Sequence, residues 1–286
     1  MSADLPVVSI GLPTFNGAAT LPTTLEFLVS QDFPNLEIVI SDNSSLDGTE
    51  DVCRTIAATY PHISYERLGR HVSAPKNFAL TLARARGAFF MWASDHDRWN
   101  RSFVSECVAA LRANDHAVLA IPSATWIDEE GRPLEEIPAL PDMRGLRQVE
   151  RTMALIWTLN NCFPVYGMFR TEALRAIFGA GDRYQPGFDA CILSDGAAMG
   201  EFINVPSATF GLTRRQDFGD GDAQLAKLGM RPRGSKLRSE FRILRFSVGR
   251  GISAARLTPK ARTKAFLVVS VAAITEYRYR HLLSSY

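Results

Sequence analysis

Residues 88–97 read AFFMWASDHD, an apolar run that stops on two carboxylates. Such a run, rich in aromatic residues, predicts a buried strand over 88–93. Carboxylates are costly to bury without partners, so Asp95 and Asp97 need a cation, a ligand or backbone N–H groups beside them. The stretch therefore predicts a strand whose carboxyl end opens onto a polar site.

Two earlier segments follow the same pattern. Residues 7–12 predict a strand that ends on the turn 13–17, and residues 36–41 predict one that ends on the polar loop 42–49. The carboxyl ends of parallel strands share one edge of a sheet, and ligands bind beyond that edge. We therefore expect these two loops and the loop 94–98 to converge on one site.

The rest of the first 213 residues continues the alternation of helices and strands. Strands at this spacing imply a mostly parallel sheet with right-handed crossovers, which is an α/β, Rossmann-like fold. Residues 129–147 contain three prolines and predict an excursion or lid loop. The further helices are predicted at about 20–31, 49–59, 74–87, 102–113, 150–159 and 189–199, and the further strands at 63–67, 117–122, 166–170 and 201–205.

Charge divides the chain into two parts. Residues 1–213 hold 16 Lys/Arg against 25 Asp/Glu, whereas residues 214–286 hold 16 against 5. We expect a basic helical extension over 214–286, which favours an anionic partner. Apolar residues at helical spacing between 237 and 252 suggest that 237–286 binds a membrane surface, or else packs on the main domain or on another subunit of a homo-oligomer.

Cysteine usage and the N-terminus favour a cytoplasmic protein. None of the four cysteines forms a close pair, so neither a zinc site nor a redox pair is indicated. Residues 1–8 lack the basic start and apolar run of a signal peptide. The apolar run 265–274 is too short to span a bilayer.

Each polar loop also has a structural explanation. Asp95 and Asp97 suit Mg²⁺ or Mn²⁺ completed by phosphate oxygens and water, but Asp97 or Ser94 also suits a helix cap. Asp42 suits hydrogen bonds with a base or a ribose hydroxyl, but also an Asx-turn. Residues 13–16 would line a nucleoside pocket or form only a turn. Taken singly, none of these loops identifies a function.

Together the loops resemble the donor half of family 2 glycosyltransferases of the GT-A fold. Order and spacing both match. The residues that carry the resemblance are VSIGLPTFN (8–16), IVISDNSSLDGT (38–49), KNFAL (76–80) with ARG (85–87), and SDHD (94–97). The resemblance implies a catalytic domain over 1–213, with a nucleotide-sugar donor half (1–125) and an acceptor half (126–213).

The resemblance also implies roles for individual residues. Asp42 would bind the base, typically uracil. Lys76 stands where the family often has Arg, and a Lys in that place cannot make the bidentate contact of an Arg. Asp97, with Asp95, would hold Mn²⁺ or Mg²⁺, whereas His96 is expected to point away from both carboxylates. The donor-binding positions are Pro13, Thr14, Phe15, Asn16, Asp42, Asn43, Lys76, Asn77 and Asp95.

The catalytic base that the resemblance implies is Asp189, in the sequence GFD (187–189). Family members often have Glu before this Asp, and here Phe188 takes that place. Asp195 is a rival, and Asp189 would alternatively be the N-cap of the following helix. Arg214 and Arg215, at the end of a predicted strand, would face the diphosphate or form a solvated basic pair.

These features predict an inverting glycosyltransferase. We expect a UDP-sugar donor and a glycan or lipid-linked acceptor of surface polysaccharide biosynthesis, at the inner face of the cell membrane. The alternative is a nucleotide-sugar-binding protein without catalysis. A dinucleotide-dependent oxidoreductase is disfavoured because no G-x-G-x-x-G follows the first strand. Nucleic-acid binding is disfavoured because the basic residues lack aromatic interleaving.

Overall fold

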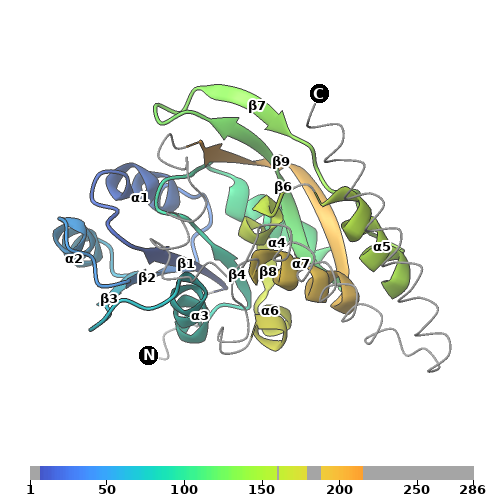
Figure 1. The fold of residues 1–286 in the computed structure, drawn as a ribbon, viewed down its shortest axis with the longest axis horizontal. Coiled ribbons are helices and arrows are strands. Elements are labelled where there is room, and N and C mark those ends of the chain that lie inside the picture. Colours follow the sequence, from blue (N-terminus) through green and yellow to red (C-terminus); the bar gives the residue numbers. More distant parts are fainter. Residues whose placement is uncertain (1–6, 160, 179–187, 215–286) are drawn as a thin grey trace, which may run out of the picture.

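The computed structural model describes residues 7–159, 161–178 and 188–214 (Figure 1). The first half of its sheet is four parallel strands in the order β3-β2-β1-β4. They are β1 (Val8–Thr14), β2 (Leu36–Asp42), β3 (Ile63–Arg67) and β4 (Phe89–Trp92). Strand β1 pairs with both β2 and β4, so the loops after these three strands lie at one edge of the sheet.

Helices α1 (Leu21–Val29), α2 (Thr49–Thr59) and α3 (Ala74–Arg84) connect these strands. In Figure 1, α1 and α3 lie on opposite sides of β1 and β2. Every residue of β1, β2 and β4 is buried, as expected for strands that are covered on both faces. The apolar runs quoted above are therefore explained by burial from two sides.

The second half of the sheet is mixed. Strands β8 (Met168–Arg170), β6 (Ala117–Ile127), β9 (Glu201–Thr213) and β5 (Arg98–Trp99) follow β4 in that order. Among these strands, β6 and β9 pair in parallel. Strand β8 is antiparallel to both β4 and β6, and β5 is antiparallel to β9. The predicted α/β fold is confirmed, and its parallel character is strongest in the first half.

One segment differs from the prediction of an irregular lid. Within residues 129–147, β7 (Pro133–Ile137) pairs with β6 in an antiparallel hairpin, seen at the top of Figure 1. The prolines made this segment look like a loop. Pro133 stands at the first position of the strand, where a missing N–H is tolerated.

The remaining helices pack against the second half. They are α4 (Phe103–Arg112), α5 (Gln148–Thr158), the 3₁₀ helix η1 (Phe163–Tyr166), α6 (Thr171–Phe178) and α7 (Phe188–Met199). Helix α7 contacts α5, α6, η1, β6 and β9. The prediction that Tyr166 starts a strand is wrong: Tyr166 ends η1, whose first turn contains Pro164.

The core is centred on Trp92 in β4. Its indole N–H donates to the Phe78 carbonyl and to the Thr81 hydroxyl, both at 3.2 Å. Its ring meets that of Phe178 edge-on, with 5.5 Å between centroids. On β1, a Cβ added at Gly11 would lie 2.6 Å from the Thr81 oxygen, so only glycine lets α3 approach this closely. This packing places the start of α3 beside the ends of β1 and β2.

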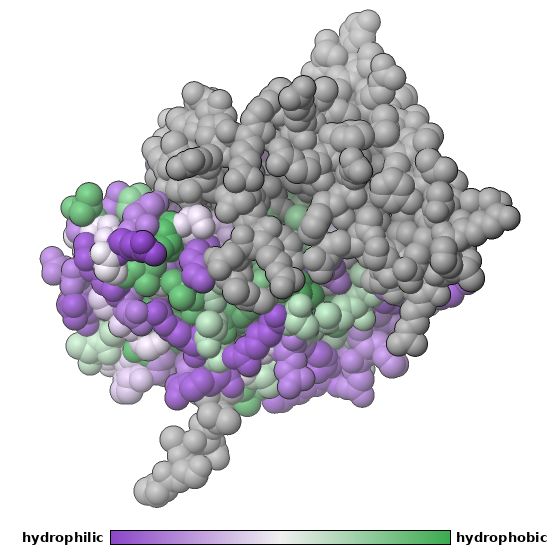
Figure 2. All heavy atoms as spheres, turned by 60° about the horizontal axis from the view of Figure 1, so that its bottom comes forward, coloured by the Kyte–Doolittle hydropathy of each residue, from purple (hydrophilic) through white to green (hydrophobic). Residues whose placement is uncertain are grey.

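The coloured part of the face drawn in Figure 2 is mainly hydrophilic, with smaller hydrophobic areas between polar residues. The exposed large hydrophobic side chains of the described residues are Leu46, Leu134, Val149 and Met199. None of the helices within these residues has both the length and the apolar character that a bilayer crossing requires. The basic extension predicted over 214–286 lies, from residue 215 on, outside the described residues.

Candidate functional site

The three polar loops meet at the carboxyl edge of β1, β2 and β4. The Thr14 hydroxyl donates to Asp95 Oδ2 at 2.5 Å, which joins the first loop to the third. The Asn43 N–H donates to the Thr14 carbonyl at 2.8 Å, which joins the second loop to the first. The Asn16 N–H donates to the Ser45 hydroxyl at 2.9 Å. The predicted convergence is confirmed.

The start of α1 approaches this junction through Gly17. A Cβ at Gly17 would lie 2.6 Å from the Thr14 hydroxyl oxygen and 2.8 Å from Asp95 Oδ2, so a side chain there would break their hydrogen bond. The preceding residue, Asn16, has a φ of 53°, a left-handed conformation that Asn tolerates better than most residues. This turn leaves Pro13 buried at the end of β1 and Asn16 exposed beside the site.

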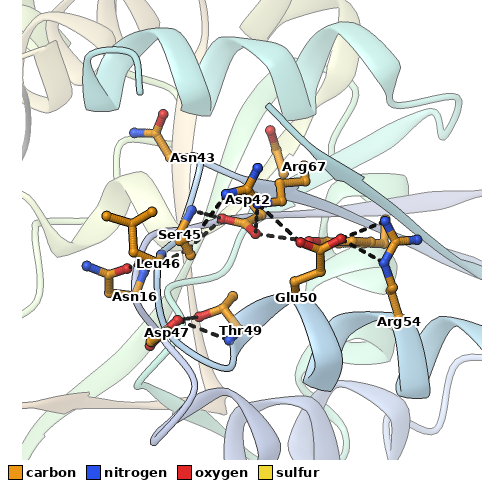
Figure 3. Close-up of polar contacts among 12 residues, drawn as sticks. Asn16, Asp42, Asn43, Ser45, Leu46, Asp47, Thr49, Glu50, Arg54 and Arg67 are labelled. Carbon is orange, nitrogen blue, oxygen red and sulfur yellow. Dashed lines mark hydrogen bonds and ion pairs between the residues drawn. The ribbon is translucent and has the colours of Figure 1, made fainter. Parts of the chain in front are cut away.

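Asp42 is at the centre of a buried network (Figure 3). Its side chain is fully buried. Oδ1 accepts from the N–H and the hydroxyl of Ser45, at 2.9 and 2.5 Å, and Oδ2 accepts from the Tyr65 hydroxyl at 2.9 Å. Arg67 Nε lies 3.9 Å from Oδ2. A carboxylate has about four acceptor positions, so most of this one is used inside the protein. The backbone bond of this side chain reaches Ser45, three residues on, and not the residue two positions on that an Asx-turn requires, so Asp42 fixes the loop in another way.

Two predicted donor-binding amides are likewise engaged within the fold. The Asn43 side chain accepts from the Val72 N–H at 2.8 Å and donates to the Val72 carbonyl at 2.9 Å. The Asn77 side chain accepts from the Ser41 hydroxyl at 2.7 Å and donates to the Ser41 carbonyl at 3.0 Å. These amides fix the 68–73 connection and α3 against β2. Lys76 lies beside Asn77 in the first turn of α3 and is partly buried.

Phe15 has an aromatic partner that the sequence did not indicate. Its ring centroid lies 4.5 Å from that of His71. His71 Nδ1 lies 3.2 Å from the Asn43 carbonyl oxygen. Because a carbonyl oxygen only accepts, Nδ1 is the donor in this hydrogen bond. Nothing in the local sequence marks His71, since its partners are distant in the chain.

Asp97 is the deeper of the two carboxylates after β4. It is 4% exposed and accepts from the Ser94 hydroxyl and from the Thr213 N–H, the latter at 2.8 Å. Burial raises the pKa of this carboxyl, against the lowering effect of His96 and of these hydrogen bonds. The end of β9 therefore holds Asp97 in place, and Thr213 is a site residue that the sequence did not reveal.

The prediction that His96 points away from both carboxylates is wrong. His96 Nδ1 lies 2.9 Å from Asp95 Oδ1, and Nε2 lies 4.0 Å from Asp97 Oδ1. A hydrogen-bond donor or a cation near a carboxylate stabilises its charge. The ring nitrogens of His96, which lies in the same turn, are placed to do this for Asp95 and Asp97.

Whether these residues fit a divalent cation depends on the metal-ligating atoms that they offer. Among the described residues, no group of three or more His, Cys, Asp or Glu side chains is arranged to hold a metal ion. Asp95 and Asp97 offer hard oxygen ligands, and each Asp97 oxygen keeps a second lone pair beyond its hydrogen bond. They therefore fit Mg²⁺ or Mn²⁺ when phosphate oxygens and water complete the coordination.

Asp189 lies on the opposite half of the sheet, in the first turn of α7. Its Oδ1 accepts from the Ala190 N–H at 2.8 Å, and the Cys162 thiol is a further hydrogen-bond partner. Burial raises the pKa of its carboxyl. The alternative that Asp189 is the N-cap is wrong, because the helix already includes Phe188. Asp195, the rival base, lies in the buried middle of α7 and is 8% exposed.

Tyr166 connects the two groups of carboxylates. Burial raises the pKa of its phenol, and the charges of Asp97, Asp189 and Asp95 raise it further. Helix η1, which ends at Tyr166, contacts both α7, which carries Asp189, and β4, which ends before Asp95 and Asp97. Sequence reasoning missed Tyr166, which resembled an ordinary strand residue.

Arg214 makes contacts within the fold that the sequence did not indicate, while Arg215 lies outside the described residues. Its guanidinium lies 3.1 Å from Glu135 Oε2 on β7 and 5.1 Å from the ring centroid of Trp126. Its N–H donates to the Ile127 carbonyl at 2.8 Å. These contacts hold the end of β9 against the β6–β7 hairpin.

Comparison with known sequences decides the family. The sequence model of Glycosyl transferase family 2 matches residues 9–178, which is more than half of the chain. This chain belongs to glycosyl transferase family 2. The match includes all three polar loops, Cys162 and Tyr166, and it stops before Asp189.

Individual relatives of this family member are distant. TuaG of Bacillus subtilis, named for a glycosyltransferase of teichuronic acid biosynthesis, is 23% identical over 137 residues, which are 48% of this chain and 54% of TuaG. The GalNAc(5)-diNAcBac-PP-undecaprenol beta-1,3-glucosyltransferase of Campylobacter jejuni is 31% identical over 94 residues, 32% of this chain and 30% of that enzyme. The chain thus matches about half of one relative and less than a third of the other.

Solved structures show the same fold. Residues 1–349 of S. aureus TarS in complex with UDP-GlcNAc align with a TM-score of 0.64 at 17% identity, over 91% of this chain and 70% of TarS 1–349. GalNAc-T7 with UDP, GalNAc and Mn²⁺ aligns with a TM-score of 0.58 at 15% identity, over 99% of this chain and 59% of that one. The expected GT-A fold is confirmed.

Proposed function

We propose that this glycosyltransferase moves a sugar, with inversion, from a UDP-sugar to a glycan or lipid-linked acceptor. The observation that carries the proposal is the packing of η1, which ends at Tyr166, against both α7, which carries Asp189, and β4, which ends shortly before Asp95 and Asp97. One side of this arrangement suits a diphosphate leaving group, and the other suits a proton acceptor. An inverting displacement needs both, on opposite sides of the reacting carbon.

The nucleoside is assigned to the ends of β1 and β2. The ring of Phe15, with that of His71 4.5 Å away, offers a stacking surface for the base. The backbone of Pro13 and the exposed side chain of Asn16 line the same edge. Asp42 keeps one acceptor position for the base, while its other contacts shape the loop.

Two further donor contacts are assigned to the neighbouring loops. Lys76 is assigned to a contact with the base or the phosphates. Asn43 and Asn77 hold the neighbouring backbone in place through their hydrogen bonds to Val72 and Ser41. Asp95, held by Thr14, is assigned to the ribose and, with Asp97, to the cation.

Proton transfer is assigned to Asp189. As the acceptor oxygen attacks the anomeric carbon, the Asp189 carboxylate takes its proton, and the bond from that carbon to the diphosphate oxygen breaks. The Cys162 hydrogen bond and the Ala190 N–H orient the carboxylate. A cation held by Asp95 and Asp97 would neutralise charge on the departing diphosphate.

The names of two relatives support a proposal for the acceptor substrate and for the place of the enzyme in the cell. The Campylobacter relative is named for an undecaprenol-linked acceptor, and TuaG for teichuronic acid biosynthesis. We infer an acceptor of surface polysaccharide biosynthesis at the inner face of the cell membrane. The catalytic part would be residues 1–213, and the basic segment 214–286 would bind the membrane or a second subunit.

A non-catalytic nucleotide-sugar-binding protein is the second candidate. The observation that favours it is Phe188 before Asp189, where family members often have Glu. Donor turnover separates the two candidates, since a binding protein would bind a UDP-sugar but neither transfer nor hydrolyse it.

The test is a thermal-shift screen of UDP-, GDP- and dTDP-sugars with and without Mn²⁺, followed by donor hydrolysis. We expect UDP-sugars to raise Tm more than the others and to be hydrolysed slowly. Stabilisation without any turnover would favour the binding protein. Stabilisation by GDP- or dTDP-sugars alone would refute the UDP assignment.

A further inference from the structure

Tyr166 is held rigidly between the two halves of the site. Helix η1, which it ends, contacts α7, β4 and β6. The helix follows Cys162, the hydrogen-bond partner of Asp189. After it, Gly167 packs so tightly that an added Cβ would lie 2.4 Å from the Ala120 carbonyl oxygen. The backbone at Tyr166 is therefore fixed on both sides.

The ring of Tyr166 rests on the strands that hold Asp97. Its centroid lies 5.7 Å from that of Phe210, which stacks on Trp99 at 5.4 Å and 27°. Three residues along β9 from Phe210, the Thr213 N–H donates to Asp97. The stacked rings of Phe210 and Trp99 thus link Tyr166 to the strands beside the turn after β4. Helix η1, which contacts α7, links it to the helix of Asp189.

The Tyr166 hydroxyl is available as a donor. The residue is partly exposed, and no hydrogen bond to this hydroxyl is found among the described residues. Burial and the charges of Asp97, Asp189 and Asp95 all favour the protonated phenol. At neutral pH the group is an uncharged O–H.

We propose, on the basis of the transferase function above, that the Tyr166 hydroxyl binds the transferred sugar by donating a hydrogen bond to one of its oxygens. In an inverting displacement, the sugar lies between the leaving diphosphate and the base. Helix η1, which ends at Tyr166, contacts both α7, which carries Asp189, and β4, which precedes Asp95 and Asp97. The nucleoside is assigned to Phe15 and Asp42, at the other end of the donor. Tyr166 would therefore recognise the sugar and not the nucleotide.

Two Tyr→Phe variants separate these contacts. Tyr166→Phe keeps the ring that packs on Phe210 and removes only the hydroxyl. Tyr65→Phe is the matched control, because the Tyr65 hydroxyl donates to Asp42 at the base end. The affinities of UDP, UDP-GlcNAc and UDP-glucose are measured by calorimetry with Mn²⁺, and Tm is measured for each variant.

We expect Tyr166→Phe to weaken binding of the preferred UDP-sugar by about three- to tenfold, the range for one neutral hydrogen bond, and to leave UDP affinity unchanged. Tyr65→Phe should weaken UDP and UDP-sugar by the same factor. Equal losses for UDP and UDP-sugar in Tyr166→Phe, or no loss at all, would overturn the sugar contact. If the wild-type chain bound neither UDP-sugar nor UDP, the UDP-sugar transferase itself would be refuted.

Discussion

Thr14 and Asp95, 81 residues apart in the chain, are joined by a hydrogen bond of 2.5 Å from the threonine hydroxyl to Oδ2. The bond orients the carboxylate that is shared between the ribose and the cation in the proposed mechanism. It lies at the end of β1, where the donor loops meet.

Thr14→Val removes this bond with little change in side-chain volume. Because Asp95 would then be free to turn, we expect the affinity for a UDP-sugar to fall by about tenfold. Thr14→Ser keeps the hydroxyl and should bind nearly as the wild type does. Calorimetric titration checks both variants, and equal affinities for Val and Ser would show that the bond has no role in donor binding.

Asp42 should contribute to stability as well as to binding. Asp42→Ala leaves buried donors of Ser45 and Tyr65 without their acceptor, so we expect the free energy of unfolding to fall by about 2 to 4 kcal/mol. Asp51→Ala, at an exposed acid in the first turn of α2, is the control and should cost less than about 1 kcal/mol. Urea denaturation without ligand measures both. An unchanged stability in Asp42→Ala would mean that Asp42 serves binding alone.

Asp189→Asn should abolish transfer and leave UDP affinity near that of the wild type. A positioned general base contributes about 10²- to 10⁴-fold to the rate, and Asn cannot accept the proton. Asp195→Asn is the control and should retain activity, provided that its Tm shows a folded protein. Turnover of a UDP-sugar measures the rate. Loss of activity in Asp195→Asn alone would move the role of base to Asp195.

The pH dependence of transfer should reflect the buried position of Asp189. Burial raises the pKa of this carboxyl above its ordinary value of 3.8, and a base works only when it is ionised. The ratio kcat/KM should therefore fall as the pH drops through the raised pKa, at a higher pH than for an exposed Asp. The thiol of Cys162 lowers this pKa, so Cys162→Ala should move the fall to higher pH still. An identical profile in Cys162→Ala would contradict this assignment.

Removal of divalent cations should stop the reaction. EDTA should abolish turnover, and Mn²⁺ or Mg²⁺ should restore it, because the two carboxylates would otherwise repel the donor diphosphate. Asp97→Asn should raise the Mn²⁺ concentration needed for half-maximal rate. Full activity in EDTA would show that His96 and other protein groups replace the cation.

Much of the fold can be predicted from local sequence. The runs 7–12, 36–41 and 88–93 are apolar because their strands are covered on both faces, and each ends in residues that suit turns. These patterns arise from burial and turn chemistry within a few residues. The sequence thus determined the α/β class, the order of the first four strands along the chain, and the polar loops to which the donor site is assigned. The resemblance in those loops identified the family.

Tertiary structure decided which side chains are free to act. Asp42 and Asn43 look equally available in the sequence, yet Ser45, Tyr65 and Val72 engage them inside the fold. His96 faces the carboxylates because of the turn after β4, which no periodicity encodes. Tyr166, at the end of η1, lies near residues 69 positions before it and 23 after it along the chain. Contacts across such separations depend on strand order and helix packing, and so only the folded chain brings them together.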